Sequence, residues 1–217
     1  QDVKWIRMMR VSAIAAFLFL VGGFAFSDKI QSFAESSAYA DRIVFTKSTP
    51  YQRIVVTQSD DDVRLFLNGN LQFSSRDEYR YHESLVHVGL VTLPRARKVL
   101  VLGGGDGLAV REVLKYPNVE KIDLVDLDAE MIHLFRDSDR FTKLNAEALR
   151  SPKVTVTNAD AFRWIKEAKE TYDFIVIDFP DPSNFSLGKL YSVAFYRELT
   201  RILADDGAVG GVFIDDQ

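Results

Sequence analysis

The chain has 217 residues, of which 47% are hydrophobic, and a formal net charge of −4 at pH 7. It is long enough to bury a core in one or two domains, and its lack of a basic block argues against a nucleic-acid partner. It contains no cysteine, which excludes disulfides, a thiolate nucleophile and a cysteine-bound metal.

The N-terminal part contains an uncharged apolar run at 11–26, VSAIAAFLFLVGGFAF. A helix of this run is slightly shorter than a hydrocarbon core of about 30 Å, and extension back to Trp5 includes Arg7 and Arg10, whose side chains can reach the membrane surface. A membrane-spanning segment, a cleaved secretory signal and a buried helix are three possible interpretations. We favour the first, because no polar face marks a soluble helix, and assign residues 1–30 to the end of a membrane region.

Residues 31–75 are expected to form a polar connector followed by a small antiparallel β-hairpin domain. Strands are predicted at 52–58, 63–67 and 71–74, and the turns SDDD and NGN separate them. The next four residues, SRDE at 75–78, have the spacing of a capping box and predict a helix that ends near Pro94.

Residues 76–217 alternate between apolar strands and helix-length segments, such as 108–116 and 193–207. This order predicts right-handed crossovers and an α/β fold with a doubly wound parallel, Rossmann-like sheet. Ligands of such sheets bind beyond the carboxyl ends of the strands. The predicted strands are 98–102, 121–126, 153–157, 173–178 and 207–214.

Four aspartates lie at these carboxyl ends. Asp106 follows the first strand, Asp126 ends the second, Asp160 follows the third and Asp178 ends the fourth. A cleft that gathers several carboxylates is unfavourable unless it binds cations. The pattern therefore indicates a binding site for a positively charged ligand.

A glycine turn precedes Asp106 and continues beyond it. Gly103, Gly105 and Gly107 form G-x-G-x-G, and Asp126 follows after about twenty residues, where a ribose-binding acid is expected in a nucleotide site. Leu108 replaces the last glycine of a dinucleotide fingerprint. A tight structural turn is the alternative for the glycines, and a surface acid or helix cap is the alternative for Asp126.

The segment YHESLVH suggests a metal site only superficially. His82 and His87 are five positions apart, about 140° around a helix, so they are poorly placed to share an ion. We therefore expect no metal.

Six segments together resemble the polyamine aminopropyltransferases, the spermidine synthase family, over residues 50 to about 210. SSRDEYRYHE is most similar to bacterial members with a membrane region ahead of the catalytic domain. The resemblance implies transfer of an aminopropyl group from decarboxylated S-adenosylmethionine, a co-substrate, to a diamine such as putrescine, giving spermidine and methylthioadenosine. It implies no cofactor. The segments are PYQRIVV, LFLNGNLQFSSRDEYRYHESLVH, VLVLGGGDGLAVREVLKYP, DLVDLDAEM, VTNADAF and YDFIVIDFPDPS.

The resemblance also implies roles for individual residues. Asp106 is expected to hold the primary amine of the donor and to repel the carboxylate that ordinary S-adenosylmethionine carries. Asp178 is the expected proton acceptor, with Tyr81 and Asp181 beside it in the amine site. The expected contacts to the donor nucleoside are Gln52, His82, Gly103, Gly105, Asp106, Asp126, Asp160 and Ala161.

Several positions depart from the family pattern. Asp126 stands for the usual glutamate, Ala161 for the usual glycine, and Phe185 for a common proline, while Phe179 and Pro180 replace small polar residues. The family's closing strands and a later tyrosine of the amine site lie beyond this sequence, so a truncated catalytic domain is expected.

The sequence leaves two other functions open, an S-adenosylmethionine-dependent methyltransferase and a non-catalytic, membrane-anchored polyamine-binding protein. The expected location is the cell membrane, attached through residues 5–26, with the catalytic domain facing the cytoplasm that supplies the donor. Lys4, Arg7 and Arg10 precede the apolar run and favour the opposite orientation by the positive-inside rule. A homodimer or larger assembly is possible, and the acceptor amine is left open.

Overall fold

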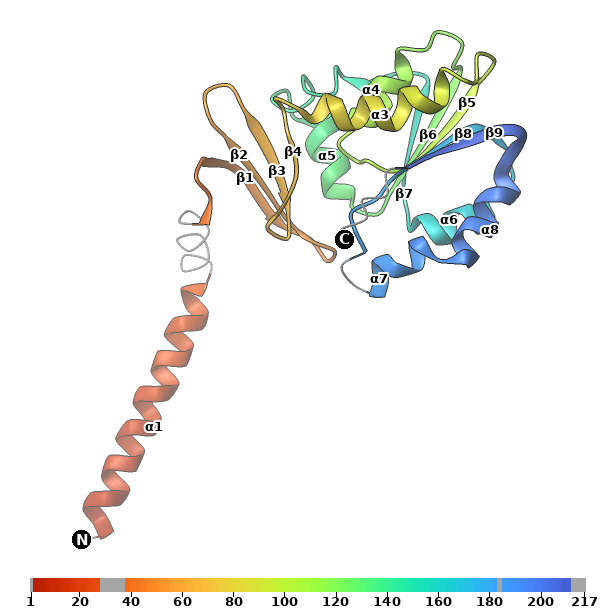
Figure 1. Ribbon diagram of the computed structural model, residues 1–217. Coiled ribbons are helices and arrows are strands. Elements are labelled where there is room, and N and C mark those ends of the chain that lie inside the picture. The colour runs from red at the N-terminus through yellow and green to blue at the C-terminus, as the bar shows by residue number, and fades with distance from the viewer. Residues whose placement is uncertain (1, 28–37, 183–184, 212–217) are drawn as a thin grey trace, which may run out of the picture.

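The structure, a computed structural model, describes residues 2–27, 38–182 and 185–211. In this part of the chain a small β-sheet packs beside a larger sheet that carries helices on both faces, and one long helix projects from the small sheet (Figure 1). The parallel α/β fold expected from the sequence is confirmed.

The larger sheet has five parallel strands in the order β7-β6-β5-β8-β9. Successive side chains of a strand point to opposite faces, so alternate residues enter two separate cores. Val99 and Val101 of β5 pack with the α3 and α4 layer, whereas Leu100 and Leu102 pack with α6 and α8. The strands are β5 (Lys98–Gly103), β6 (Lys121–Asp126), β7 (Val154–Asn158), β8 (Tyr172–Asp178) and β9 (Leu203–Gly211).

The helices of this domain are short, and side-chain caps begin three of them. Asp128 caps α5, Asp160 caps α6 and Ser192 caps α8, each by accepting a backbone N–H of the first turn. The helices are α3 (Glu78–Leu90), α4 (Leu108–Leu114), α5 (Ala129–Asp137), η1 (Ala148–Arg150), α6 (Ala161–Glu167), α7 (Phe185–Gly188), η2 (Lys189–Tyr191) and α8 (Val193–Ile202).

The smaller sheet is antiparallel and has the order β1-β2-β3-β4. Sequence analysis missed β1, because this edge strand is mostly half-buried or exposed and lacks a clear alternation of apolar residues. The sheet packs on the larger domain through Phe73, whose ring centroid lies 6.1 Å from that of Phe135. Its strands are β1 (Arg42–Ser48), β2 (Arg53–Gln58), β3 (Val63–Leu67) and β4 (Asn70–Ser74).

The capping box predicted at 75–78 is wrong. The Ser75 hydroxyl accepts the Val63 N–H and donates to Asp62, so it serves the small sheet and not α3. The Glu78 carboxylate binds Arg111 and His82 and does not turn back onto the helix start. The spacing of residues 75–78 therefore predicted the position of the helix correctly, but it predicted the wrong hydrogen-bond partners for Ser75 and Glu78.

The last predicted helix and strand also differ from the structure. The helix α8 ends at Ile202, and β9 begins at Leu203, which pairs with Tyr172 of β8. The pairing is then interrupted and resumes between Ala208 and Phe174. Asp205 and Asp206 lie in the interrupted part and are exposed. Their polar sequence is typical of a helix end, which explains why the predicted helix is too long. Residues 212–214 of the predicted strand lie outside the described residues.

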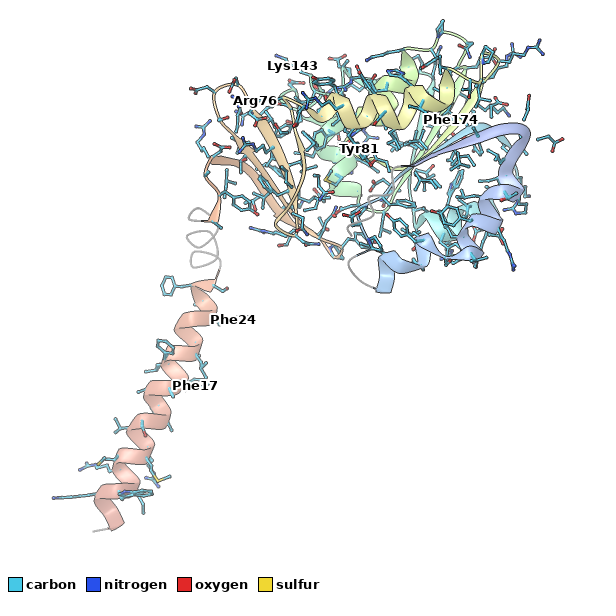
Figure 2. The ribbon with its side chains drawn as sticks, viewed as in Figure 1. Phe17, Phe24, Arg76, Tyr81, Lys143 and Phe174 are labelled. Carbon is cyan, nitrogen blue, oxygen red and sulfur yellow. The ribbon has the colours of Figure 1, made fainter. Side chains whose placement is uncertain are left out.

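The N-terminal helix α1 (Asp2–Ala25) contains a stretch, Lys4–Ala25, whose length and mean hydropathy of 1.9 would allow it to cross a membrane. None of this stretch is buried against the rest of the chain. Phe17 and Phe24 project into open space (Figure 2), and 85% of Phe24 is exposed. Within the described residues the helix is therefore not part of a buried core.

Candidate active site

The glycine turn after β5 brings the backbone close to the end of β8. Gly103 pairs with Asp178 in the parallel register and has a φ of +81°, which disfavours any side chain. A Cβ at Gly103 would lie 2.1 Å from the Asp178 carbonyl oxygen. Gly103 therefore allows the backbone end of β8 to lie beside the turn, and Gly104, whose Cβ would lie 2.7 Å from Asp178 Oδ2, leaves room for the carboxylate.

Asp106 and Asp178 come together with His82 of α3. A ring nitrogen of His82 and one carboxylate oxygen of each aspartate all lie within 4.8 Å of one another. We call these three residues the inner cluster. The Tyr81 hydroxyl donates to Asp178 Oδ1 at 2.9 Å, and the Leu108 N–H donates to Asp106 Oδ1 at 2.9 Å. The cluster combines residues that the sequence assigned separately to the donor and the amine sites.

Burial raises the pKa of both aspartates in the inner cluster, and the charge of Asp178 raises that of Asp106 further. Burial alone would lower the pKa of His82, but the hydrogen bond to Glu78 and the charges of both aspartates raise it to about 9. The raised pKa values of the two aspartates mean that their negative charges are poorly compensated within the cluster. Such a site favours a further cation.

Asp126 lies at the end of β6, next to the same glycine turn. Its carboxylate accepts the Gly105 N–H at 3.0 Å and the Asp128 N–H at 2.8 Å. Asp128, not Asp126, caps the following helix, so the alternative role of Asp126 as the cap is wrong. Burial raises the pKa of Asp126 to about 6.

Asp160 and Ala161 lie beyond the end of β7. The Asp160 carboxylate accepts the Arg163 N–H and forms an ion pair with Lys189 at 2.5 Å. Although burial alone would raise its pKa, the hydrogen bond from Lys189 lowers it. Ala161 is buried. An open cavity of about 420 Å³ lies beside them, lined by Tyr51, Leu127, Asn158, Ala159, Asp160, Arg163, Trp164 and Glu167.

In the part of the chain that the structure describes, neither Gln52 nor Asp181 forms a hydrogen bond or ion pair with the inner cluster. Gln52 Nε2 donates to Asp128 Oδ2 at 2.9 Å, and Thr49 donates to the same oxygen at 2.8 Å, so both attach the small sheet to the start of α5. Asp181 is exposed, near Tyr191. Ser183 and Asn184, which follow it, lie outside the described residues, as does the side chain of Phe185.

A second group joins Glu83 and His87 of α3 with Glu112 of α4, and we call these three residues the outer cluster. Its ligand atoms also lie within 4.8 Å of one another. The two histidines thus belong to different clusters, as their spacing predicted. In the outer cluster the Lys115 ammonium lies 2.5 Å from Glu112, where it supplies the positive charge that a metal would bring.

Sequence analysis missed two residues that contact the inner cluster directly or through one partner. Glu78 accepts a hydrogen bond from His82, and Arg111 pairs with Glu78. The i, i+4 spacing of Glu78 and His82 was a usable signal, but Glu78 had been assigned to a capping box. Arg111 comes from another helix, and only the fold brings it there.

Comparison with known proteins gives the family. The spermine/spermidine synthase domain matches residues 78–212. The chain is 55% identical to a polyamine aminopropyltransferase of Leptospira interrogans over 196 residues, which are 90% of this chain and 39% of that protein. It is 56% identical to polyamine aminopropyltransferase 2 of Ralstonia nicotianae over 190 residues, 88% of this chain and 37% of that protein.

Solved structures agree with this family and with the fold. A spermidine synthase in complex with the transition-state analogue AdoDATO has a TM-score of 0.73 and 32% identity, covering 78% of this chain and 57% of that chain. The spermidine synthase of Thermotoga maritima has a TM-score of 0.71 and 31% identity, covering 78% of this chain and 56% of that chain. The chain spans less than half the length of the curated relatives. It belongs to the spermine/spermidine synthase family.

Proposed function

We propose that this protein transfers the aminopropyl group of decarboxylated S-adenosylmethionine to a primary amine of a diamine. The observation that carries the proposal is the inner cluster, in which the buried Asp106 and the half-buried Asp178 face one imidazolium at the carboxyl edge of the sheet. Both substrates bring ammonium groups, and the donor also brings a sulfonium. The names of the relatives, polyamine aminopropyltransferase and spermidine synthase, support the same reaction.

Asp106 selects the donor in this proposal. The ammonium of the decarboxylated donor binds its carboxylate, whereas ordinary S-adenosylmethionine would place a second carboxylate nearby. Two like charges about 4 Å apart repel by about 4 kcal/mol at an effective dielectric constant of about 20. A repulsion of this size disfavours ordinary S-adenosylmethionine about a thousandfold.

Asp178 accepts the proton of the attacking amine. A free primary amine has a pKa of about 10.4, so little of it is neutral at pH 7. Because burial raises the pKa of Asp178, the gap between acceptor and amine narrows. The neutral nitrogen then forms a bond to the aminopropyl carbon while the carbon–sulfur bond breaks, and methylthioadenosine leaves as a neutral thioether. Tyr81 orients Asp178, and Asp181 binds the distal part of the amine.

The nucleoside of the donor extends from the inner cluster along the ends of β5, β6 and β7. Gly103 and Gly105 allow its close approach, and Asp126 accepts the ribose hydroxyls. Asp160 and Ala161 contact the adenine, for which the cavity of about 420 Å³ provides space. Gln52 contacts the donor from the small sheet.

A product assay on the full-length protein tests the reaction. Decarboxylated S-adenosylmethionine is offered with putrescine, cadaverine, agmatine or spermidine, and products are separated by mass. Methylthioadenosine with an aminopropylated amine supports the proposal, and putrescine is the acceptor we expect to react fastest. Transfer of a methyl group from ordinary S-adenosylmethionine, or binding without turnover, would contradict it.

We also propose that α1 anchors the protein in the cell membrane with the catalytic domain in the cytoplasm, where it can assemble as a homodimer or larger. The exposed apolar surface of α1 supports anchoring. Full-length protein should sediment with membranes and resist extraction by high salt and carbonate. Recovery in the soluble fraction without detergent would contradict the anchor, and protease access from the cytoplasmic side tests the orientation.

A further inference from the structure

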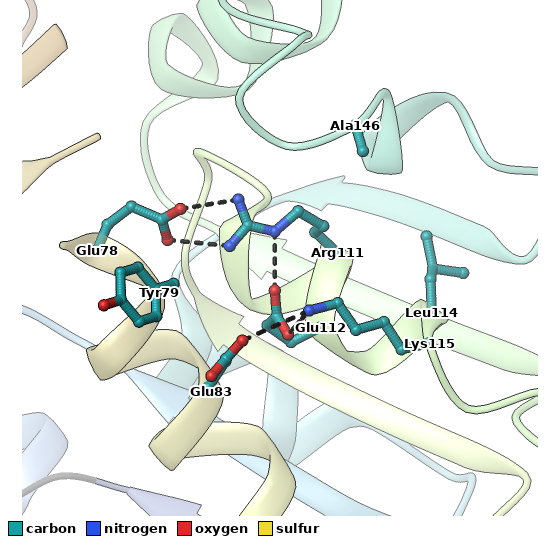
Figure 3. A pocket seen from close by; sticks show the side chains of 8 residues that line it. All are labelled: Glu78, Tyr79, Glu83, Arg111, Glu112, Leu114, Lys115 and Ala146. Carbon is teal, nitrogen blue, oxygen red and sulfur yellow. Dashed lines mark hydrogen bonds and ion pairs between the residues drawn. The ribbon is translucent and has the colours of Figure 1, made fainter. Parts of the chain in front are cut away.

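A chain of hydrogen bonds runs from α4 to His82. Arg111 donates to both carboxylate oxygens of Glu78, Nη1 to Oε1 at 2.9 Å and Nη2 to Oε2 at 3.0 Å (Figure 3). Glu78 Oε2 lies 2.8 Å from His82 Nδ1. Arg111 is itself held by Glu112 and by the Leu144 carbonyl oxygen, so the guanidinium is fixed in place.

This chain determines which His82 nitrogen can exchange a proton. Nδ1 faces two acceptors, the Glu78 carboxylate and the Glu78 carbonyl oxygen at 2.9 Å, and neither can donate. Nδ1 therefore carries a hydrogen in both charge states. Nε2 is the position at which His82 gains or loses its charge.

The charged groups around His82 come from four elements. Glu78 lies on its own helix, and its charge is balanced by Arg111 of α4. Asp106 comes from the turn before α4, and Asp178 from the end of β8. Tyr81 packs edge-on against the imidazole, with ring centroids 5.0 Å apart. Among the residues that the structure describes, neither aspartate has an ion pair with lysine or arginine, so His82 is their nearby cation.

We propose that Glu78 and Arg111 are positioning residues that hold His82 as a protonated counter-ion of Asp106 and Asp178, and that the cationic donor displaces this proton when it binds. The inference rests on the proposed function, because it takes the donor ammonium as the cation that reaches Asp106. The proton leaves Nε2 for the buffer, and the neutral nitrogen becomes a hydrogen-bond acceptor for the arriving ammonium. The positive charge of His82 thus compensates the aspartates in the free enzyme, and the ammonium of the donor replaces it in the complex.

The inference predicts the titration of His82 in the free and bound protein. The raised pKa of about 9 agrees with a charged His82 in the free state. The chain has three histidines, so NMR of full-length protein with ¹⁵N-labelled histidine, in detergent micelles, can resolve them, with H82Q used for assignment. Free His82 should stay charged through pH 8, and the donor should lower its pKa by at least one unit. Methylthioadenosine, which lacks the ammonium, should shift it less.

A pair of matched variants separates positioning from general stability. E78Q keeps the size of the side chain but removes the charge beside His82. E83Q makes the same change on the same helix, at a side chain that pairs with Lys115 and not with His82. E78Q should lower the free His82 pKa by at least one unit, and E83Q should leave it unchanged. R111K, which loses the bidentate contact, should give an intermediate shift and serves if E78Q does not fold.

Enzyme kinetics provides a second readout. The wild-type kcat/KM for the donor should rise with pH until His82 loses its proton, and E78Q should move this rise to lower pH. A merely structural Glu78 would reduce activity equally at every pH. A neutral free His82 at pH 7, or a His82 pKa that the donor does not move, would overturn the inference.

The titration of the free protein does not depend on turnover. If no aminopropylated product forms but free His82 is charged and E78Q shifts its pKa, the proposed function is wrong and the positioning of His82 stands. If product forms while free His82 is neutral, the function stands and the positioning is wrong.

Discussion

The inner and outer clusters each combine one histidine of α3 with two acidic residues, yet the pKa values of their buried acids shift in opposite directions. In the inner cluster, burial raises the pKa of Asp106 and Asp178. In the outer cluster, burial would raise the pKa of Glu112, but hydrogen bonds from Lys115 and Arg111 lower it. Burial alone therefore does not identify a functional carboxylate. The number of cations within reach decides whether the group favours a ligand.

The outer cluster borders the larger of the two described cavities, about 470 Å³ in volume (Figure 3). This cavity has no lining residue from the inner cluster. Its acidic side chains are already paired with Arg111 and Lys115. We therefore place the proposed reaction at the inner cluster, where the acidic charges are poorly compensated, and not at the larger cavity.

The largest expected effect is the loss of the proton acceptor. Asp178→Asn should lower kcat by about 10²–10⁴ at neutral pH, the usual contribution of a general base. Donor affinity, measured by calorimetry, should change much less. E83Q of the outer cluster is the control and should keep wild-type turnover. Near-wild-type kcat for Asp178→Asn at pH 7 would remove this residue from the mechanism.

The charge of His82 should appear in the stability of the protein. Its pKa rises from 6.5 to about 9 on folding, so the folded chain binds more protons in this interval and the free energy of unfolding should fall as the pH rises through it. Below pH 6.5 the stabilisation is fully present. Denaturant unfolding between pH 6 and 9.5 measures the slope, and H82Q should reduce it. An equal slope in both proteins would contradict the assignment.

Some of the features on which these two predictions depend could be predicted from the sequence, and others could not. The four aspartates at strand ends, the glycine turn and the parallel order follow from local pattern, because strands, turns and helices alternate regularly from Lys98 onward. The Glu78 and Arg111 link, the β1 edge strand and the end of α8 do not. Each depends on a partner distant in sequence, which local spacing does not determine. At Glu78 the helix-cap motif predicted the wrong partner, because the carboxylate binds Arg111 and His82 instead of the start of the helix.

Donor selection by Asp106 has a smaller expected effect. Asp106→Asn should weaken binding of decarboxylated S-adenosylmethionine by about 10-fold to 150-fold, because hydrogen bonds to charged groups contribute about 1.5–3 kcal/mol. Binding of ordinary S-adenosylmethionine should weaken less or improve, since a repulsion is removed. Asparagine can still accept the Leu108 N–H that Asp106 accepts. A purely structural Asp106 would therefore leave the ratio of the two affinities unchanged in calorimetry.

The smallest effect is expected at the outer cluster, where the ion pair between Lys115 and Glu112 stabilises the fold. Lys115→Met removes the ammonium beside Glu112 and should lower the free energy of unfolding by about 1 kcal/mol, near the upper end for exposed ion pairs because Glu112 is buried. Lys143→Met is the matched control, because Lys143 is exposed and forms no ion pair with any residue that the structure describes. Because the pKa of Glu112 is lowered from 4.5, the contribution of the pair exists above that pH and is lost as the pH falls through the lowered pKa. The difference in stability between Lys115→Met and wild type should therefore shrink in acid, while turnover per folded molecule stays at the wild-type level. A loss of turnover without a loss of stability would show that the outer cluster also takes part in the chemistry, and the distinction between the two clusters would fail.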